Sequence, residues 1–178
     1  MLAAGYVAVG LDHYALPGDS MATATAAGQL RRNFQGYTTD GAAALLGLGA
    51  SSISALPQGY TQNMPGVPSW RDAIRAGTLP TARGITLTAD DRLRRAVIEQ
   101  LMCGLEVDLV AVATAYQADP APLLAAGPDL AAQARDGLIE WDGRRIRVTA
   151  LGKPFMRATA ALFDRYLHVG GSRHAATV

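Results

Sequence analysis

The side chains best suited to chemistry in this chain lie in one run, Arg31–Thr39. The run holds two cations, two amides, two aromatic rings and two threonine hydroxyl groups around a single glycine. It has no hydrophobic period, so it predicts neither a core strand nor an amphipathic helix. So many hydrogen-bonding groups instead indicate a loop that lines a site. In such a loop the ring of Phe34 offers a stacking face, and the amide of Gln35 offers a donor and an acceptor.

Two other positions carry side chains that could act on a ligand. Asp12 and His13 follow an apolar run and could form an acid/base pair. Ile53 lies between serines and could press an apolar side chain onto a ligand ring. These positions, like Phe34 and Gln35, also have a purely structural interpretation. His13 could make a hydrogen bond at a strand end, and Ile53 could pack in the core. Phe34 could be a buried ring, with the Gln35 amide bonded to loop backbone. The residues alone leave these alternatives open.

The elements that would position these residues alternate between strand and helix. Residues 6–11 are apolar at nearly every position and predict a buried strand. Asp19 or Ser20 is suited to cap a helix that continues to Leu30, and residues 45–50 predict a second buried strand. Strand, helix, polar loop and strand are typical of a parallel α/β sheet, whose ligands bind at the carboxyl ends of the strands.

The second half of the chain predicts a mainly helical domain. Thr88 is suited to cap its first helix, and further helices are expected over 109–116 and 122–134. Asp142–Gly143 lies between two short runs with strand character and predicts a β-hairpin. A last helix is expected over 151–167. Helices followed by a hairpin wing and another helix resemble a winged-helix arrangement.

Length and composition limit the possible classes of protein. The 178 residues suffice for one or two domains, which we expect at 1–82 and 83–168, followed by a frayed tail at 169–178. The chain is 49% hydrophobic and 17% charged, as a globular protein is. Its net charge of +1 argues against general binding to nucleic acid or to a membrane surface. No apolar run approaches the roughly 20 residues of a membrane span, so we expect a cytoplasmic protein.

Five motifs resemble the family of oxygen-independent coproporphyrinogen III oxidases. The motifs are Gly10–Ala15, Arg32–Thr39, Leu46–Ser54, Tyr60–Asn63 and Asp90–Arg95. Their order and spacing follow the family from Gly5 to Leu167. The resemblance implies a radical S-adenosylmethionine oxidoreductase of haem and porphyrin biosynthesis, which converts two propionates of coproporphyrinogen III to vinyl groups and so gives protoporphyrinogen IX. It also implies the last strands of a partial (β/α) TIM-type barrel, followed by the helical domain, in a protein that is a monomer at full length.

The resemblance further implies two cofactors, S-adenosylmethionine and a 4Fe–4S cluster. Phe34 and Gln35 match family positions that contact a second S-adenosylmethionine, and Ile53 matches a position that contacts the first. From their places in loops, four residues are expected to face the cavity for the small-molecule substrate: Asp12, His13, Tyr37 and Gln62. No catalytic residue and no metal ligand is predicted in this chain.

The chain departs from the family pattern at the cluster. The family binds it through a Cys-x-x-x-Cys-x-x-Cys motif near the N-terminus, whereas Cys103 is the single cysteine here. Together with the start of the chain in a buried strand, this predicts a C-terminal fragment that is inactive alone. Two alternatives remain: a haem-binding chaperone of the same superfamily, and a winged-helix nucleic-acid-binding module formed by residues 85–167. The small net charge argues against the second.

Overall fold

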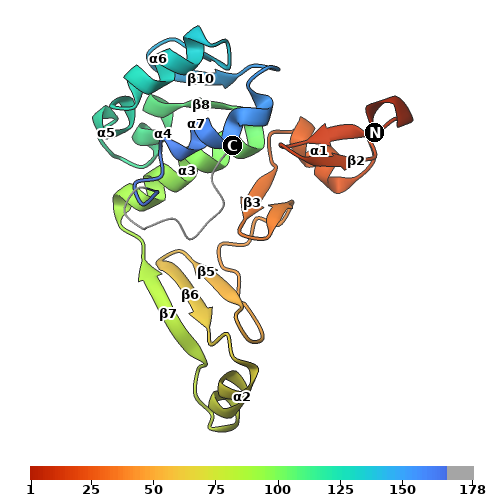
Figure 1. The fold of residues 1–178 in the computed structure, drawn as a ribbon, viewed down its shortest axis with the longest axis vertical. Helices are drawn as coiled ribbons and strands as arrows, with labels where there is room; N and C mark the ends of the chain where they lie inside the picture. Colours follow the sequence, from red (N-terminus) through yellow and green to blue (C-terminus); the bar gives the residue numbers. More distant parts are fainter. Residues whose placement is uncertain (168–178) are drawn as a thin grey trace. The chain divides into compact units, whose positions relative to one another are not determined.

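The computed structural model describes residues 1–167 and shows a mixed α/β protein (Figure 1). The chain divides into two compact units. Unit 1 combines Met1–Asp40 with Leu93–Val178, and unit 2 is Gly41–Arg92. Helix α3 (Ala89–Gly104) runs across the boundary. The units therefore do not follow the predicted domains at 1–82 and 83–168, which stay a prediction.

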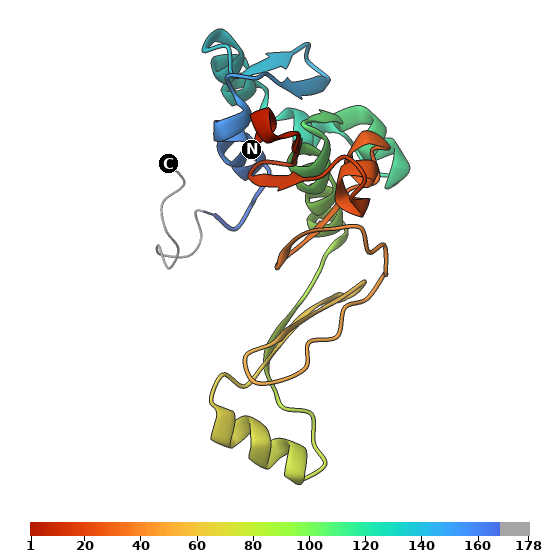
Figure 2. The same cartoon turned by 90° about the vertical axis from the view of Figure 1, so that its right-hand side faces the viewer.

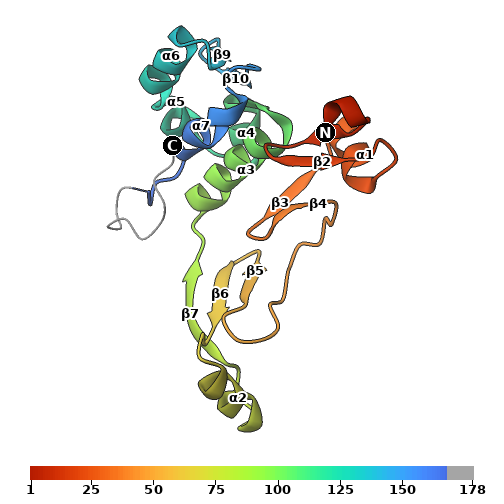
Figure 3. The ribbon, with the colours of Figure 1, turned by 45° about the vertical axis from the view of Figure 1, so that its right-hand side comes forward.

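The first part of unit 1 consists of two small antiparallel hairpins and a helix (Figure 3). The elements in order are η1 (Leu2–Ala4), β1 (Val7–Val9), β2 (His13–Ala15), α1 (Ser20–Ala26), β3 (Arg31–Asn33) and β4 (Gly36–Thr38). Asp19 caps α1 as predicted, because its side chain accepts a hydrogen bond from the backbone N–H of Met21. Val9, Leu30 and Tyr37 form a small buried cluster between these elements.

The second part of unit 1 holds the main core. It contains α4 (Leu109–Ala115), α5 (Ala121–Leu124), α6 (Gly127–Arg135), η2 (Lys153–Phe155), α7 (Met156–Ala161), and a sheet of β8 (Glu106–Asp108), β10 (Arg145–Val148) and β9 (Ile139–Trp141) in that order. Helix α3 contributes Val97 and Leu101, which are fully buried against residues of the other elements. The largest fully buried side chains of this core are Phe163, Leu101, Leu109, Leu123, Leu130, Ile146 and Met156.

Unit 2 is a three-stranded antiparallel sheet with one helix. Its strands are β5 (Ile53–Leu56), β6 (Gly59–Asn63) and β7 (Thr81–Thr86), with β6 in the middle. Helix α2 (Val67–Arg75) connects β6 to β7 and lies beyond one end of the sheet (Figure 2). At the end of the unit, the Thr88 hydroxyl accepts from the backbone N–H of Asp91 in the first turn of α3, which confirms the predicted cap. The Asp91 carboxylate in turn accepts from the backbone N–H and the hydroxyl of Thr88.

The predicted parallel sheet is wrong for the described residues, where every strand pairing is antiparallel. The strand predicted over 6–11 is shortened to β1, because the chain turns back at Gly10, which has φ +57°. Residues 45–50 form no strand beyond an isolated bridge of Leu45 to Ala55, and the side chain of Leu48 is 89% exposed. Gly49 with φ +102° breaks the extended conformation there, and apolar residues alone do not supply a partner strand.

Several other boundaries also differ from the prediction. The polar run that was expected to be a loop forms the β3–β4 hairpin instead. The helix expected over 122–134 is split into α5 and α6, and the helix expected over 151–167 is reduced to η2 and α7. The hairpin around Asp142–Gly143 is confirmed as β9 and β10. The predicted tail at 169–178 lies outside the described residues.

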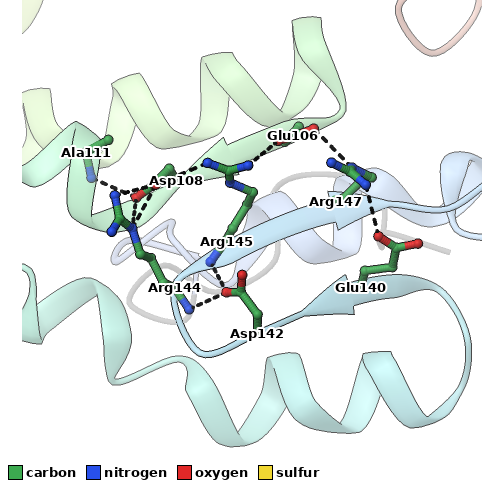
Figure 4. A network of polar contacts seen from close by, with 8 residues as sticks. All are labelled: Glu106, Asp108, Ala111, Glu140, Asp142, Arg144, Arg145 and Arg147. Atoms are coloured by element: carbon green, nitrogen blue, oxygen red, sulfur yellow. Dashed lines mark hydrogen bonds and ion pairs between the residues drawn. The ribbon is translucent and has the colours of Figure 1, made fainter.

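A ladder of charged side chains runs along the β8–β10–β9 sheet, and Asp108 lies toward one end of it (Figure 4). Its carboxylate accepts from Nε of Arg144 at 2.8 and 2.9 Å and pairs with Arg145 at 3.6 Å. It also caps α4 by accepting from the backbone N–H of Ala111 at 2.8 Å. The side chain is only 14% exposed. The hydrogen bond from Arg144 is the main reason that the pKa of Asp108 falls from 3.8 to about 2.

The other charges of the ladder are paired in the same way. Arg147 lies between Glu106 at 3.1 Å and Glu140 at 3.3 Å. Asp142 closes the hairpin turn by accepting from the backbone N–H groups of Arg144 and Arg145 at 2.9 and 2.6 Å. The three arginines of this hairpin therefore face carboxylates of their own unit.

We predict that Asp108→Asn lowers the free energy of unfolding by about 1 kcal/mol near neutral pH, since the amide can still cap α4 but no longer neutralises the half-exposed arginines. The pKa of Asp108 is lower in the folded chain than its ordinary 3.8. Its ionised form therefore stabilises the fold above that pH, and the contribution is lost as the pH falls toward about 2. Urea unfolding as a function of pH measures this.

Asp136→Asn is the matched control, because Asp136 is exposed at the end of α6. The difference in the free energy of unfolding between wild type and Asp108→Asn should shrink as the pH is lowered from 3.8 to about 2. The control should stay close to wild type at every pH. A destabilisation of Asp108→Asn that persists undiminished at the acid end would contradict the ion pair as its cause.

Candidate functional site

Tyr37 is the centre of a polar and aromatic cluster in unit 1. Its side chain is 9% exposed. The hydroxyl donates to the carbonyl of Met102 and accepts from the backbone N–H of Leu11, each at 2.9 Å. The Met102 carbonyl belongs to the last turn of α3, where carbonyls have no partner within the helix. One hydroxyl thus satisfies two backbone groups from segments far apart in the sequence.

The turn between β1 and β2 lies directly on the Tyr37 ring. A Cβ atom at Gly10 would lie 2.1 Å from Cζ of Tyr37, so only glycine fits this close approach. The positive φ of Gly10 also favours glycine. The ring and the turn that carries Asp12 and His13 are therefore fixed relative to each other.

Asp12 and His13, which the sequence predicts as a pair, do interact. Nδ1 of His13 lies 2.8 Å from Oδ1 of Asp12, and the imidazole packs edge-on to the Tyr37 ring with centroids 5.1 Å apart. Arg157, from α7, lies 3.5 Å from the other carboxylate oxygen of Asp12. The hydrogen bond from His13 is the main cause that lowers the pKa of Asp12, and the charge of Arg157 is a smaller contribution in the same direction. The pair is exposed and is held beside Tyr37.

Arg32 also packs on Tyr37, and its guanidinium carbon lies 4.7 Å from the ring centroid. The backbone N–H of Arg32 donates to Glu99 of α3 at 3.4 Å. Burial raises the pKa of the Tyr37 hydroxyl above its ordinary value. Burial and then the charge of Glu99 raise the pKa of the Cys103 thiol to about 11. Within residues 1–167 no group of three or more histidine, cysteine or acidic side chains could hold a metal ion.

Phe34 and Gln35 form the exposed tip of the β3–β4 hairpin. The side chain of Phe34 is 45% exposed, so the ring is not part of the core. The side chain of Asn33 stabilises the turn, because its Oδ1 accepts a hydrogen bond from the backbone N–H of Gln35 at 2.8 Å. Gly36 completes the turn with φ +138°. The hairpin thus presents an accessible ring and an accessible amide on an ordered turn.

The remaining predicted residues, Ile53 and Gln62, belong to unit 2 and face each other in the β5–β6 register. The Gln62 amide is bonded at both ends: Oε1 accepts from Nε of Arg83 at 2.8 Å, and Nε2 donates to the carbonyl of Ser51 at 3.0 Å. The predicted residues therefore form one group in unit 1 and one in unit 2.

Sequence reasoning missed the residues that support the first group. These are Glu99, Met102 and Arg157, which contact Arg32, Tyr37 and Asp12 respectively, from elements up to 145 positions away. Nothing in the local sequence marks them, because their role depends on a tertiary contact.

Tyr37→Phe should lower the free energy of unfolding by about 2 kcal/mol, because the Leu11 N–H and the Met102 carbonyl both lose their partner in a buried place. Urea unfolding gives the free energy, and the exchange rate of the Leu11 amide gives the local effect. Tyr14→Phe, at an exposed tyrosine in β2, should change the free energy by less than about 0.5 kcal/mol. Equal stability of Tyr37→Phe and wild type would show that the hydroxyl does not join the two segments.

Comparison with known proteins shows what the chain is similar to. Residues 87–155 match the model of the HemN C-terminal domain. Oxygen-independent coproporphyrinogen III oxidase of Bradyrhizobium diazoefficiens is 45% identical over 98% of this chain, and that of Pseudomonas aeruginosa is 43% identical over 94%. The chain spans 39% and 36% of the length of these relatives.

A solved structure agrees with the sequence comparisons. It is coproporphyrinogen III oxidase (HemN) from Escherichia coli, described as a radical SAM enzyme, with 39% identity and a TM-score of 0.84. The match covers 93% of this chain and 38% of that protein. Over most of its length the chain is therefore similar to oxygen-independent coproporphyrinogen III oxidases, and its residues 87–155 match the HemN C-terminal domain.

Proposed function

We propose that this chain supplies part of the ligand site of an oxygen-independent coproporphyrinogen III oxidase, an oxidoreductase of porphyrin and haem biosynthesis. The reaction is the oxidative decarboxylation of coproporphyrinogen III to protoporphyrinogen IX. The observation that carries the proposal is the exposed, ordered tip of the β3–β4 hairpin, with Phe34 and Gln35 side by side. The identity of 45% with a named oxidase over 98% of the chain supports it.

Phe34 and Gln35 are suited to hold S-adenosylmethionine. An aromatic ring with an accessible face can stack on an adenine, and a carboxamide can donate to and accept from the edge of the same base. The backbone hydrogen bond to Asn33 fixes the turn before any ligand arrives, which lowers the entropy cost of binding. Ile53, at the start of β5, would make an apolar contact with another S-adenosylmethionine.

Asp12 and His13 are suited to a substrate that carries carboxylates. The Asp12 carboxylate bonds Nδ1 of His13 and thereby orients the ring, so that Nε2 is the imidazole nitrogen left for a ligand. Arg157 and Arg32 add positive charge around this pair. The guanidinium groups of these arginines are donors that match the propionates of coproporphyrinogen III. Tyr37 and Gln62, whose polar groups are bonded within the protein, would each act by positioning their own neighbours.

The 4Fe–4S cluster of radical S-adenosylmethionine enzymes does not fit the donor groups of this chain. Such clusters are held by several cysteine thiolates, whereas the sequence contains one cysteine, Cys103. The raised pKa of that thiol further opposes ligation. Cluster chemistry must therefore be supplied by residues outside this sequence, and no step through the cluster is assigned to the residues described above.

We also propose the finer architecture that the family implies. Residues 1–82 would correspond to the last part of a partial barrel, and residues 83–168 to a helical domain with a winged-helix-like hairpin.

The nucleic-acid alternative gains no support, because Arg144, Arg145 and Arg147 of the hairpin pair with carboxylates of the same sheet. Within residues 1–167, no helix is long and apolar enough to cross a membrane.

The chain should bind S-adenosylmethionine, and Phe34→Ala should weaken that binding about tenfold, since stacking on an aromatic ring is worth about 1 kcal/mol or slightly more. Isothermal titration measures the affinity, and thermal unfolding checks that the fold is intact. Phe155→Ala is the matched control, because the Phe155 side chain is 44% exposed, as Phe34 is 45%. Equal affinity of Phe34→Ala and wild type would remove the ring from the proposed site.

A second prediction concerns turnover. After treatment with iron, sulfide and a reductant, the purified chain should form no 5′-deoxyadenosine from S-adenosylmethionine, because one cysteine cannot hold the cluster. Mass spectrometry of the products decides this. Catalytic formation of 5′-deoxyadenosine by this polypeptide alone would contradict the assignment of the cluster to other residues.

A further inference from the structure

The loop over residues 47–52 is crowded and strained. A Cβ atom at Gly47 would lie 2.6 Å from the carbonyl oxygen of Ile53, so the backbones of these two residues are in close contact. Gly49 has φ +102°, and Ser51 has φ +61°, which a residue with a side chain rarely adopts. A loop in such a conformation persists only if its surroundings hold it.

The side chain of Asn63, in the middle strand β6, makes two of the bonds that hold this loop. Its Nδ2 donates to the carbonyl of Gly47 at 3.3 Å and to the carbonyl of Gly49 at 2.9 Å. The backbone N–H of Asn63 donates to the carbonyl of Ser52 at 2.9 Å. Asn63 is half-buried, which strengthens these bonds relative to exposed ones. A single residue thus contacts the loop near its start, middle and end.

A β-bulge in β7 lies opposite the two consecutive residues of β6 that bond the same loop. Gln62 pairs with Arg83, but Asn63 pairs with Thr81, so Ala82 is the extra residue. Neighbouring side chains of a regular strand point to opposite faces, whereas a bulge increases the local twist and redirects them. Here the Gln62 amide donates to the carbonyl of Ser51 while the Asn63 amide donates to the two glycine carbonyls.

The loop leads directly into Ile53, and Gly47 is packed against the Ile53 backbone. Any movement of Gly47 or Ser51 therefore moves Ile53. We propose that Asn63 is a positioning residue, which sets the place of Ile53 for its contact with S-adenosylmethionine by holding the 47–52 loop. The inference rests on the proposed function for the role of Ile53. It requires an amide at position 63, because a carboxylate there would repel both glycine carbonyls.

Asn63→Asp and Asn63→Ala test the inference in the full chain. Each removes the two donated hydrogen bonds, so the amides of Gly47 and Ser51 should exchange with solvent about tenfold faster or more. The affinity for S-adenosylmethionine should fall by about tenfold in the same variants. Gln58→Glu is the matched control, because it makes the same change of amide to carboxylate on the exposed turn at the far end of the β5–β6 hairpin. Gly47→Ala, which displaces the Ile53 backbone directly, should weaken binding in the same way.

The readouts separate the possible failures. Unchanged exchange at Gly47 and Ser51 in both Asn63 variants overturns the inference, whatever the binding data show. Faster exchange with unchanged affinity also overturns it, since the loop would then not position Ile53 for the ligand. Exchange that accelerates throughout β5, β6 and β7, together with a lower melting temperature, shows a merely structural role and overturns it as well. If the wild-type chain binds no S-adenosylmethionine, the proposed function fails, and the role toward the ligand falls with it, while the exchange data still decide whether Asn63 holds the loop.

Discussion

The hydroxyl of Tyr37 is bonded to two backbone groups that the sequence separates widely, the N–H of Leu11 and the carbonyl of Met102. The first belongs to the turn that carries Asp12 and His13. The second lies in the last turn of helix α3, within the residues that match the HemN C-terminal domain. A buried polar group without a partner costs more free energy than a typical hydrogen bond gains. The phenol therefore fixes the first hairpin of unit 1 to the helical part of that unit, and Gly10 leaves the space that this contact needs.

The same constraint decides how the candidate site of unit 1 is presented. Tyr37 belongs to β4 and is one strand residue away from the hairpin tip that carries Phe34 and Gln35. Arg32 and His13 pack on its ring. The side chains proposed to contact ligand and substrate are therefore exposed, while the backbone that carries them is held in place by its neighbours. Unit 2 uses amides of β6 for the same purpose, since Gln62 and Asn63 both hold backbone carbonyls of the loop before Ile53.

Local signals predicted the elements whose structure depends on neighbouring residues. The caps at Asp19 and Thr88 and the hairpin at Asp142–Gly143 follow from side chains that bond nearby backbone, and all three are present. The apolar run 45–50 misled the prediction, because burial of a strand depends on partners that the run itself does not encode. The sequence motifs predicted the candidate site residues themselves but not the distant residues that contact them. The contact of Arg157 with Asp12 joins residues 145 positions apart, and no local pattern indicates it.

The central claim is that this chain, in two separate units, carries contact residues for S-adenosylmethionine. The most direct measurement is to titrate S-adenosylmethionine into isotope-labelled protein and map the backbone amides whose NMR signals move. The account predicts shifts at Phe34 and Gln35 in unit 1 and around Ile53 in unit 2, with little change in the β8–β10–β9 sheet. Shifts confined to other surfaces, or none at concentrations where the ligand would saturate the site, would contradict it.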